Sequence, residues 1–227
     1  LRALLTHLNR DPVFGEICAS LENRGRPHAW LTGLWGPARA FFWAGVAERT
    51  GRPMLLLAPT REEARAWYDQ LRMFLRHPDP DQERLFLFPG RESLPYEHAL
   101  ADMDNEGERL EVLDRLVRGE RPVVVAACEQ ARERLPDPAW FLERTLLLTV
   151  GQHLALETLS AALVERGYVR EPVIEGRGQF AVRGGIVDVF PPAELTPWRI
   201  EFEGSEIASM RRFHLVPDDT TPPAPVQ

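Results

Sequence analysis

Residues 175–192, EGRGQFAVRGGIVDVFPP, determine how the second half of the chain is interpreted. Alternating apolar and β-branched residues in this stretch are typical of a β-strand, and glycines at 176, 178, 184 and 185 predict turns on either side of it. The residues that follow the second turn, IVDVFPP, again have strand composition and end at two prolines. The stretch therefore predicts strand structure that is broken by two glycine turns.

The two faces of the predicted strand differ in chemistry. Alternation puts Phe180 on one side, and puts Arg177 and Arg183 on the other together with Gln179 and Ala181. An unbroken strand would separate the two arginines by roughly 20 Å, which is too far for one small anion and suits an acidic protein surface. The alternative is that these arginines are solvated edge charges that discourage sheet-to-sheet aggregation.

The composition indicates a globular protein and limits its partners. The chain has 227 residues, 44% of them hydrophobic, and a net charge of -7, which argues against sequence-independent nucleic-acid binding as its main role. All 27 basic residues are arginine. The two cysteines lie far apart, and no apolar run is long enough to span a membrane, so we expect reduced thiols, no signal peptide and a cytoplasmic location.

Strands and helices alternate in the first part of the chain, which predicts a parallel sheet covered by helices over residues 1–135. The strands are expected at 28–34, 54–58, 85–88 and 122–127, and the helices at 38–50, 61–75, 106–117 and 129–135. Two prolines at 136 and 138 disfavour helix around them and predict the domain boundary.

A different order follows the boundary, with one helix and several consecutive strands, which predicts a smaller α+β domain over residues 139–216. The helix is expected at 153–166 and the strands at 145–150, 169–174, 179–190, 198–202 and 207–215. The proline-rich residues 217–227 predict a linker.

Two neighbouring motifs carry a resemblance to a known family. GQFAVRGGIVDVFPP (178–192) followed by TPWRIEFEGSEIASMRRF (196–213) resembles the second domain of the UvrB-like module, in which an F-x-V-R-G strand precedes a hydrophobic strand ending in Phe-Pro and an acidic hairpin. This module occurs in the excision-repair protein UvrB and at the N-terminus of transcription-repair coupling factors, and the family uses it to bind UvrA. The resemblance implies a helicase-like α/β domain with a partial parallel sheet, completed by a segment beyond Gln227.

On this resemblance, five residues are the candidates for contact with UvrA. Arg183 and Arg177 are expected to make the charge contacts, with Arg170 as a third charge. Phe180 and Phe190 are expected to support them by packing.

The stretch LTGLWGPARAFF (31–42) lies where the family has its nucleotide-binding loop. Gly33 and Gly36 keep their places, but Ala38 replaces a glycine, Arg39 replaces the phosphate-binding lysine and Ala40 replaces the hydroxyl residue that holds magnesium.

Pro37 also removes one N–H donor from this loop, and the chain has no lysine that could restore the lost contact. We therefore expect no catalysis and no ATP or other cofactor in this chain, with ATP and Mg²⁺ bound by a downstream motor of the parent protein. The alternative is that Arg39 still holds an anion at the helix N-terminus.

The segment FPGRESLPYEHALADMD (88–104) favours one branch of the family. UvrB has a long tyrosine-rich hairpin at this place, whereas this segment is short and is similar to the LPY segment of the coupling factors. The implied function is to recruit UvrA to stalled RNA polymerase in transcription-coupled nucleotide excision repair, within an ATP-dependent DNA translocase that itself contacts the polymerase and DNA. The rival hypothesis is a fragment of a UvrB-type ATP-dependent, DNA-binding helicase.

The sequence contains no complete metal-binding or catalytic motif. Asp102, Asp104, Glu106 and Gly107 imitate the start of a calcium loop, but its twelfth position is Leu113 rather than a bidentate glutamate. The histidines and cysteines show no metal-ligand spacing.

Overall fold

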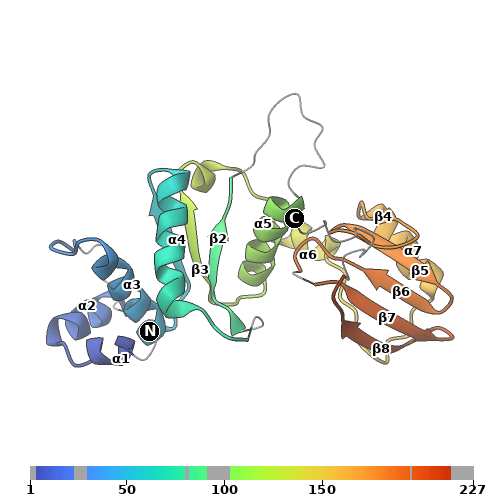
Figure 1. The fold of residues 1–227 in the computed structure, drawn as a ribbon, viewed down its shortest axis with the longest axis horizontal. Coiled ribbons are helices and arrows are strands. Elements are labelled where there is room, and N and C mark those ends of the chain that lie inside the picture. Colours follow the sequence, from blue (N-terminus) through green and yellow to red (C-terminus); the bar gives the residue numbers. More distant parts are fainter. Residues whose placement is uncertain (1–3, 23–29, 80–81, 91–102, 195, 216–227) are drawn as a thin grey trace, which may run out of the picture. The chain divides into compact units, whose positions relative to one another are not determined.

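The structure is a computed structural model that describes residues 4–22, 30–79, 82–90, 103–194 and 196–215 (Figure 1). Two compact units divide the described residues: 4–90 with 108–135, and 103–107 with 136–215. One unit contains a parallel sheet and the other a mixed sheet, each with helices, which confirms the predicted α/β class. The predicted linker 217–227 and most of the segment 88–104 lie outside the described residues.

The first unit is built on a three-stranded parallel sheet with the order β1-β3-β2. Its strands are β1 (Met54–Ala58), β2 (Leu85–Phe88) and β3 (Val123–Ala127). All five residues of the central strand β3 are buried, as expected for a parallel strand covered on both faces.

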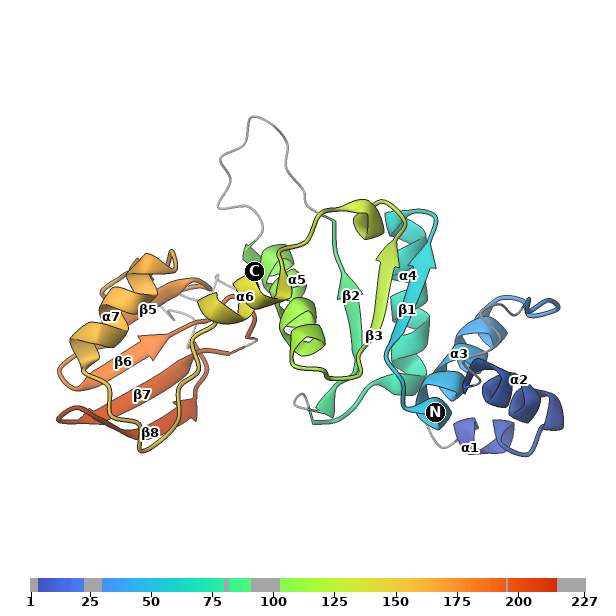
Figure 2. The same cartoon turned by 180° about the vertical axis from the view of Figure 1, so that it is seen from behind.

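Helices lie on both faces of this sheet (Figure 1 and Figure 2). Val123 and Val125 pack in the same core cluster as α4 (Arg61–Leu75), whereas the alternate residue Val124 packs with α5 (Met103–Val117). Thr60 caps the start of α4, where its hydroxyl accepts the Glu63 N–H at 3.1 Å. Alternation along a single strand therefore divides the unit into two apolar layers.

Three further helices precede β1. They are α1 (Leu5–Leu8), α2 (Pro12–Glu22) and α3 (Pro37–Thr50), and α3 contacts both of the others. Phe14 and Phe42 join α2 to α3 edge to face, with ring centroids 5.5 Å apart.

The strand predicted at 28–34 is wrong over the part that the structure describes. Residues 30–34 form no strand, and Trp30 is 96% exposed. The apolar composition of this stretch therefore reflects exposed side chains rather than a buried strand, so α3 follows a loop.

The second unit contains α6 (Pro138–Arg144), α7 (Leu156–Glu165) and a five-stranded sheet in which consecutive strands are neighbours. Its strands are β4 (Val169–Arg170), β5 (Gln179–Arg183), β6 (Ile186–Val189), β7 (Trp198–Glu203) and β8 (Glu206–Arg212). β4 is parallel to β5, and the other pairs are antiparallel.

One face of this sheet packs against α7. Leu159 and Leu163 of the helix share a core cluster with Phe180, Val187 and Ile200 from three consecutive strands. The cluster anchors β5, β6 and β7 to one helix, so the sequence around Phe180 is held in a fixed register.

Two predictions near the start of this unit are wrong. Residues 145–150 form no strand, although Leu146 and Leu148 pack on the core, because an extended segment needs a ladder partner to be a strand. The prolines around Asp137 do not exclude helix: the Asp137 carboxylate accepts the N–H groups of Ala139 and Trp140 and caps α6, with Pro138 in its first turn.

Candidate partner-binding surface

Arg183 lies at the end of β5, where a tight hairpin leads into β6. Arg183 pairs with Ile186, so Gly184 and Gly185 form the turn between them. Gly184 has φ +57°, a conformation that favours glycine in two-residue hairpins. The glycine pair thus sets the end of β5, and Arg183 is the last residue of that strand.

The two candidate phenylalanines are packing residues. Phe180 is fully buried against α7, whereas Phe190 is 8% exposed and packs with Ile174 and Ala181 on the other side of β5. Neither ring is free to contact a partner, so both support the strand that carries Arg183.

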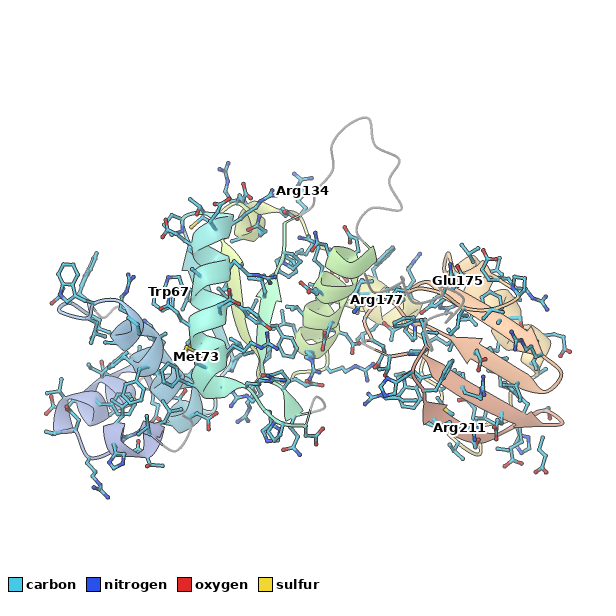
Figure 3. All side chains as sticks on the ribbon, in the orientation of Figure 1. Trp67, Met73, Arg134, Glu175, Arg177 and Arg211 are labelled. Carbon is cyan, nitrogen blue, oxygen red and sulfur yellow. The ribbon has the colours of Figure 1, made fainter. Side chains whose placement is uncertain are left out.

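The face opposite α7 is not the open, charged face that alternation predicted. Ala181 is only 2% exposed, because the chain leading into β5 folds over it and packs Ile174 against it. Gln179 fixes this loop: its Oε1 accepts the N–H groups of Glu175 at 2.7 Å and Gly176 at 3.1 Å. Figure 3 labels Glu175 on this loop.

Arg183 and Arg177 both hold backbone carbonyls of this region. Arg183 is exposed and donates from Nε and Nη2 to the Pro172 carbonyl at 3.3 and 3.0 Å. Arg177 is half-buried and donates to the Pro192 carbonyl at 3.2 Å (Figure 3). The two arginines therefore have a structural role besides any contact with a partner.

The expected unbroken strand from Arg177 to Arg183 is wrong. Gly178 has φ +75° and β5 begins only at Gln179, so the alternation that put both arginines on one face stops before Arg177. The estimated separation of the two arginines along a single strand does not apply.

Arg170 does not join Arg183 on the same face. β4 pairs Arg170 with Phe180, and paired residues share a face, so Arg170 is on the α7 side of the sheet. Arg183 is three residues beyond Phe180 and belongs to the alternate set. Of the three predicted charges, Arg183 is thus the one exposed on the face away from α7.

Sequence reasoning missed two exposed valines on the segment that runs from β4 past the Pro172 carbonyl. Val173 directly follows the carbonyl that binds Arg183, and Val169 pairs with Gln179 on the same face; each valine is 55% exposed. We call Arg183, Val169 and Val173 the Arg183 surface. The sequence does not predict that these two valines are exposed, because an exposed valine and a buried valine have the same sequence pattern.

A second arginine contact was also missed, on the central strands. Arg199 forms a two-pronged ion pair with Asp188, at 2.7 Å from Nε and 2.8 Å from Nη2, and the hydrogen bond to Asp188 raises the pKa of Arg199. Beside the core cluster under α7, burial raises the pKa of the Tyr168 hydroxyl to about 12. The ion pair is visible only once the register of β6 and β7 is known.

The loop before α3 offers few donors to a phosphate. Pro37 has no N–H, and the next two amides are already used: Ala38 donates to the Trp35 carbonyl and Arg39 to the Gly36 carbonyl, each at 3.2 Å. A phosphate cradle needs several free N–H groups that point at the ligand. This turn instead satisfies its donors locally.

The side chains of the loop are also not available to bind a phosphate or a magnesium ion. The Arg39 guanidinium lies over the Trp67 ring at 5.1 Å, and Ala40 is fully buried in the core. Ala38 and the two glycines, Gly33 and Gly36, are exposed and carry no functional group. The structure thus brings these five residues together at the start of α3 without a magnesium ligand among them.

In the part of the chain that the structure describes, no group of three or more His, Cys, Asp or Glu side chains could hold a metal ion. Among the same residues, no helix is long and apolar enough to cross a membrane.

Residues 146–222 match the family model of the UvrB interaction domain. The chain is 32% identical to the transcription-repair-coupling factor of Bacillus subtilis over 209 residues, 92% of this chain and 17% of that protein. The chain carries a UvrB interaction domain and is related to the transcription-repair-coupling factors. The predicted resemblance is thereby confirmed.

Two other coupling factors give the same picture. That of Mycobacterium tuberculosis is 35% identical over 205 residues, 87% of this chain and 16% of that protein. That of Escherichia coli is 28% identical over 180 residues, 79% of this chain and 15% of that protein. The chain therefore spans only about one-sixth of the curated coupling factors that it matches, and the UvrB interaction domain includes all five candidate contact residues.

Proposed function

We propose that this chain is the non-catalytic, UvrA-binding module of a transcription-repair coupling factor. In this role it recruits UvrA to stalled RNA polymerase during transcription-coupled nucleotide excision repair. The observation that carries the proposal is the match of residues 146–222 to the UvrB interaction domain, because that range includes the whole sheet on which Arg183 is exposed.

The Arg183 surface has the chemistry of a protein contact. A guanidinium anchored by a backbone carbonyl loses little freedom when it meets a carboxylate, and it keeps an unused Nη1 that can donate to a partner. The exposed Val169 and Val173 add apolar area around it. Truncating one partner of such a charge pair at an interface costs about 2 to 5 kcal/mol.

A pull-down of purified UvrA by this chain tests the proposal. UvrA should be retained by the unchanged chain and by Arg183→Lys in reduced amount, and lost with Arg183→Glu. Circular dichroism melting of each variant controls for the bond from Arg183 to Pro172. Failure of the unchanged chain to retain UvrA at high concentration would contradict the proposal.

We also propose that this chain holds no nucleotide at the loop before α3 and needs no cofactor, while the parent protein uses ATP and Mg²⁺ elsewhere. The used amides of Ala38 and Arg39 support this proposal. Calorimetry with Mg-ATP should show no micromolar binding that depends on Arg39. Such binding, if it disappeared in Arg39→Ala, would favour an active loop.

The remaining parts of the proposal concern the parent protein. It acts in the cytoplasm as an ATP-dependent DNA translocase, contacts RNA polymerase and DNA, and carries this module in cis. The rival, a UvrB-type helicase fragment, predicts DNA binding and ATPase activity in the isolated chain. The net charge of -7 predicts no DNA gel shift at physiological salt.

A further inference from the structure

A hollow of about 560 Å³ opens in the first unit at the end of the sheet where β2 and β3 begin. Its walls come from the connection between α4 and β2, from the end of α5 and from the turn before β3. Sites for small molecules commonly have volumes of about 300 to 1,000 Å³. This hollow lies at the opposite end of the strands from the carboxyl ends, where α/β sheets usually bind ligands.

Arginines line this hollow, and two of them lack a carboxylate partner among the described residues. Arg84 donates from Nε to the Arg121 carbonyl at 3.0 Å and from Nη2 to the Arg52 carbonyl at 3.4 Å, which are neutral acceptors. The exposed guanidinium of Arg121 forms no ion pair within the described part of the chain. Two guanidinium groups thus line the hollow without an ion pair of their own among the described residues.

The carboxylates of the hollow are already used. Glu83 accepts three backbone N–H groups, those of His77 at 3.1 Å, Arg84 at 2.9 Å and Leu85 at 3.0 Å. Glu120 accepts from Nη1 of Arg115 at 3.0 Å. These bonds hold the acidic groups in place and leave Arg84 and Arg121 free to attract an external anion.

Arg115 supplies a second, independent observation. Its guanidinium stacks on Phe86 at 4.6 Å, and both residues line the hollow. Its Nε is the one buried side-chain nitrogen or oxygen without a hydrogen-bond partner in the described residues. An unused donor is rare in a folded protein, and such exceptions are found at functional sites.

We propose that this hollow is a binding site for a small molecule that carries phosphate groups. The phosphate groups would contact Arg84 and Arg121, and the wall formed by Arg115 and Phe86 would set the depth of the site. The arrangement favours a phosphate over a single carboxylate, because several guanidinium donors from different segments converge on one hollow. The site is separate from the Arg183 surface and from the loop before α3.

Calorimetric titration of the chain with inorganic pyrophosphate tests this site, with Arg121→Ala as the variant. Arg121 is exposed and its side chain holds nothing together, so the variant should fold normally. Arg134→Ala is the matched control, because it removes the same charge from the opposite end of β3 (Figure 3). A parallel titration with magnesium-free ADP distinguishes a phosphate site from one that also recognises a nucleoside.

We expect pyrophosphate to bind the unchanged chain and Arg134→Ala alike, and to bind Arg121→Ala about tenfold more weakly, because a charge-assisted contact is lost. Tighter binding of ADP than of pyrophosphate would assign a nucleotide, and equal or weaker binding would assign the phosphate groups alone. Absence of binding, or equal weakening in both variants, would overturn the proposal. UvrA pull-down by Arg121→Ala should remain unchanged, which separates this test from that of the proposed function.

Discussion

The two sheets of the molecule differ in how one of their faces is covered. In the three-stranded parallel sheet, Leu55 and Leu57 of β1 are 60% and 45% exposed, so apolar side chains are left to water. In the five-stranded sheet, the face away from α7 is covered by the loop before β5 and by the ion pair of Asp188 with Arg199. The first sheet thus has an unfinished apolar face, whereas that of the second is finished at its centre by a packed loop and a polar contact, with Val169 and Val173 exposed beside it.

The difference indicates which unit can act alone. An exposed apolar pair on a sheet is typical of a surface that other parts of a protein cover, while a satisfied polar face needs no cover. The unit that matches the UvrB interaction domain is therefore the one with the covering loop and the polar contact, and we call it the complete unit. Substitutions in the two sheets should therefore change the free energy of unfolding by different amounts.

The largest effect is expected at Phe180, the centre of the complete unit. Phe180→Ala removes a fully buried ring beneath α7 and should destabilise this unit by about 3 to 5 kcal/mol. Hydrogen exchange of the amides in β5, β6 and β7 measures the loss, while amides of β3 in the other unit serve as an internal control. Equal loss of protection in β3 would mean that the two units do not unfold separately.

A smaller effect is expected at Asp188, whose side chain is 10% exposed. Asp188→Asn removes the charge opposite Arg199 and should cost about 2 kcal/mol in urea unfolding. Glu201→Gln is the matched control, since its ion-pair partner Arg211 is 56% exposed, and that change should cost less than about 0.5 kcal/mol. Equal costs in the two variants would show that the polar face contributes no specific stability.

The second unit should also lose stability in alkali. Burial raises the pKa of Tyr168 from 10.0 to about 12, so the folded state favours the neutral phenol. This contribution is complete below pH 10 and disappears as the pH rises through 12, a loss of about 2 kcal/mol. Unfolding of Tyr168→Phe measured across this window should show a flatter pH dependence, and an unchanged slope would contradict the assignment.

The smallest effect is expected on the unfinished face of the first sheet. Leu57→Gln replaces a side chain that is 45% exposed and should change stability by less than about 0.5 kcal/mol. Urea unfolding of the chain measures this difference. A cost similar to that of Phe180→Ala would show that the face is covered within this chain, and the contrast between the two sheets would be lost.

The sequence predicted the parts of the fold that depend on local patterns. Strands β1, β2 and β3 and helix α4 were predicted because apolar runs and helical patterns are local signals. Residues 145–150 and 30–34 have similar composition but form no strand, because a ladder partner is a tertiary property. The prolines on either side of Asp137 were predicted to disfavour a helix, but Asp137 caps α6.

The candidate site was predicted in part, for the same reason. The hairpin glycines and Phe180 were recognisable from pattern, and Arg183 is exposed at its end. The turn at Gly178 and the loop packed over Ala181 were not predictable, because both depend on how residues 171–178 return to the sheet. The opposite faces of Arg170 and Arg183 follow only from the register of β4.

We propose that Arg183, on the face away from α7, is the charge that UvrA recognises. The direct measurement is the dissociation constant of UvrA for the unchanged chain and for two charge reversals, Arg183→Glu and Arg170→Glu. We predict that Arg183→Glu weakens binding by about 30-fold or more, and that Arg170→Glu, on the opposite face, changes it by less than about threefold. Equal weakening by both reversals, or none by Arg183→Glu, would contradict the account.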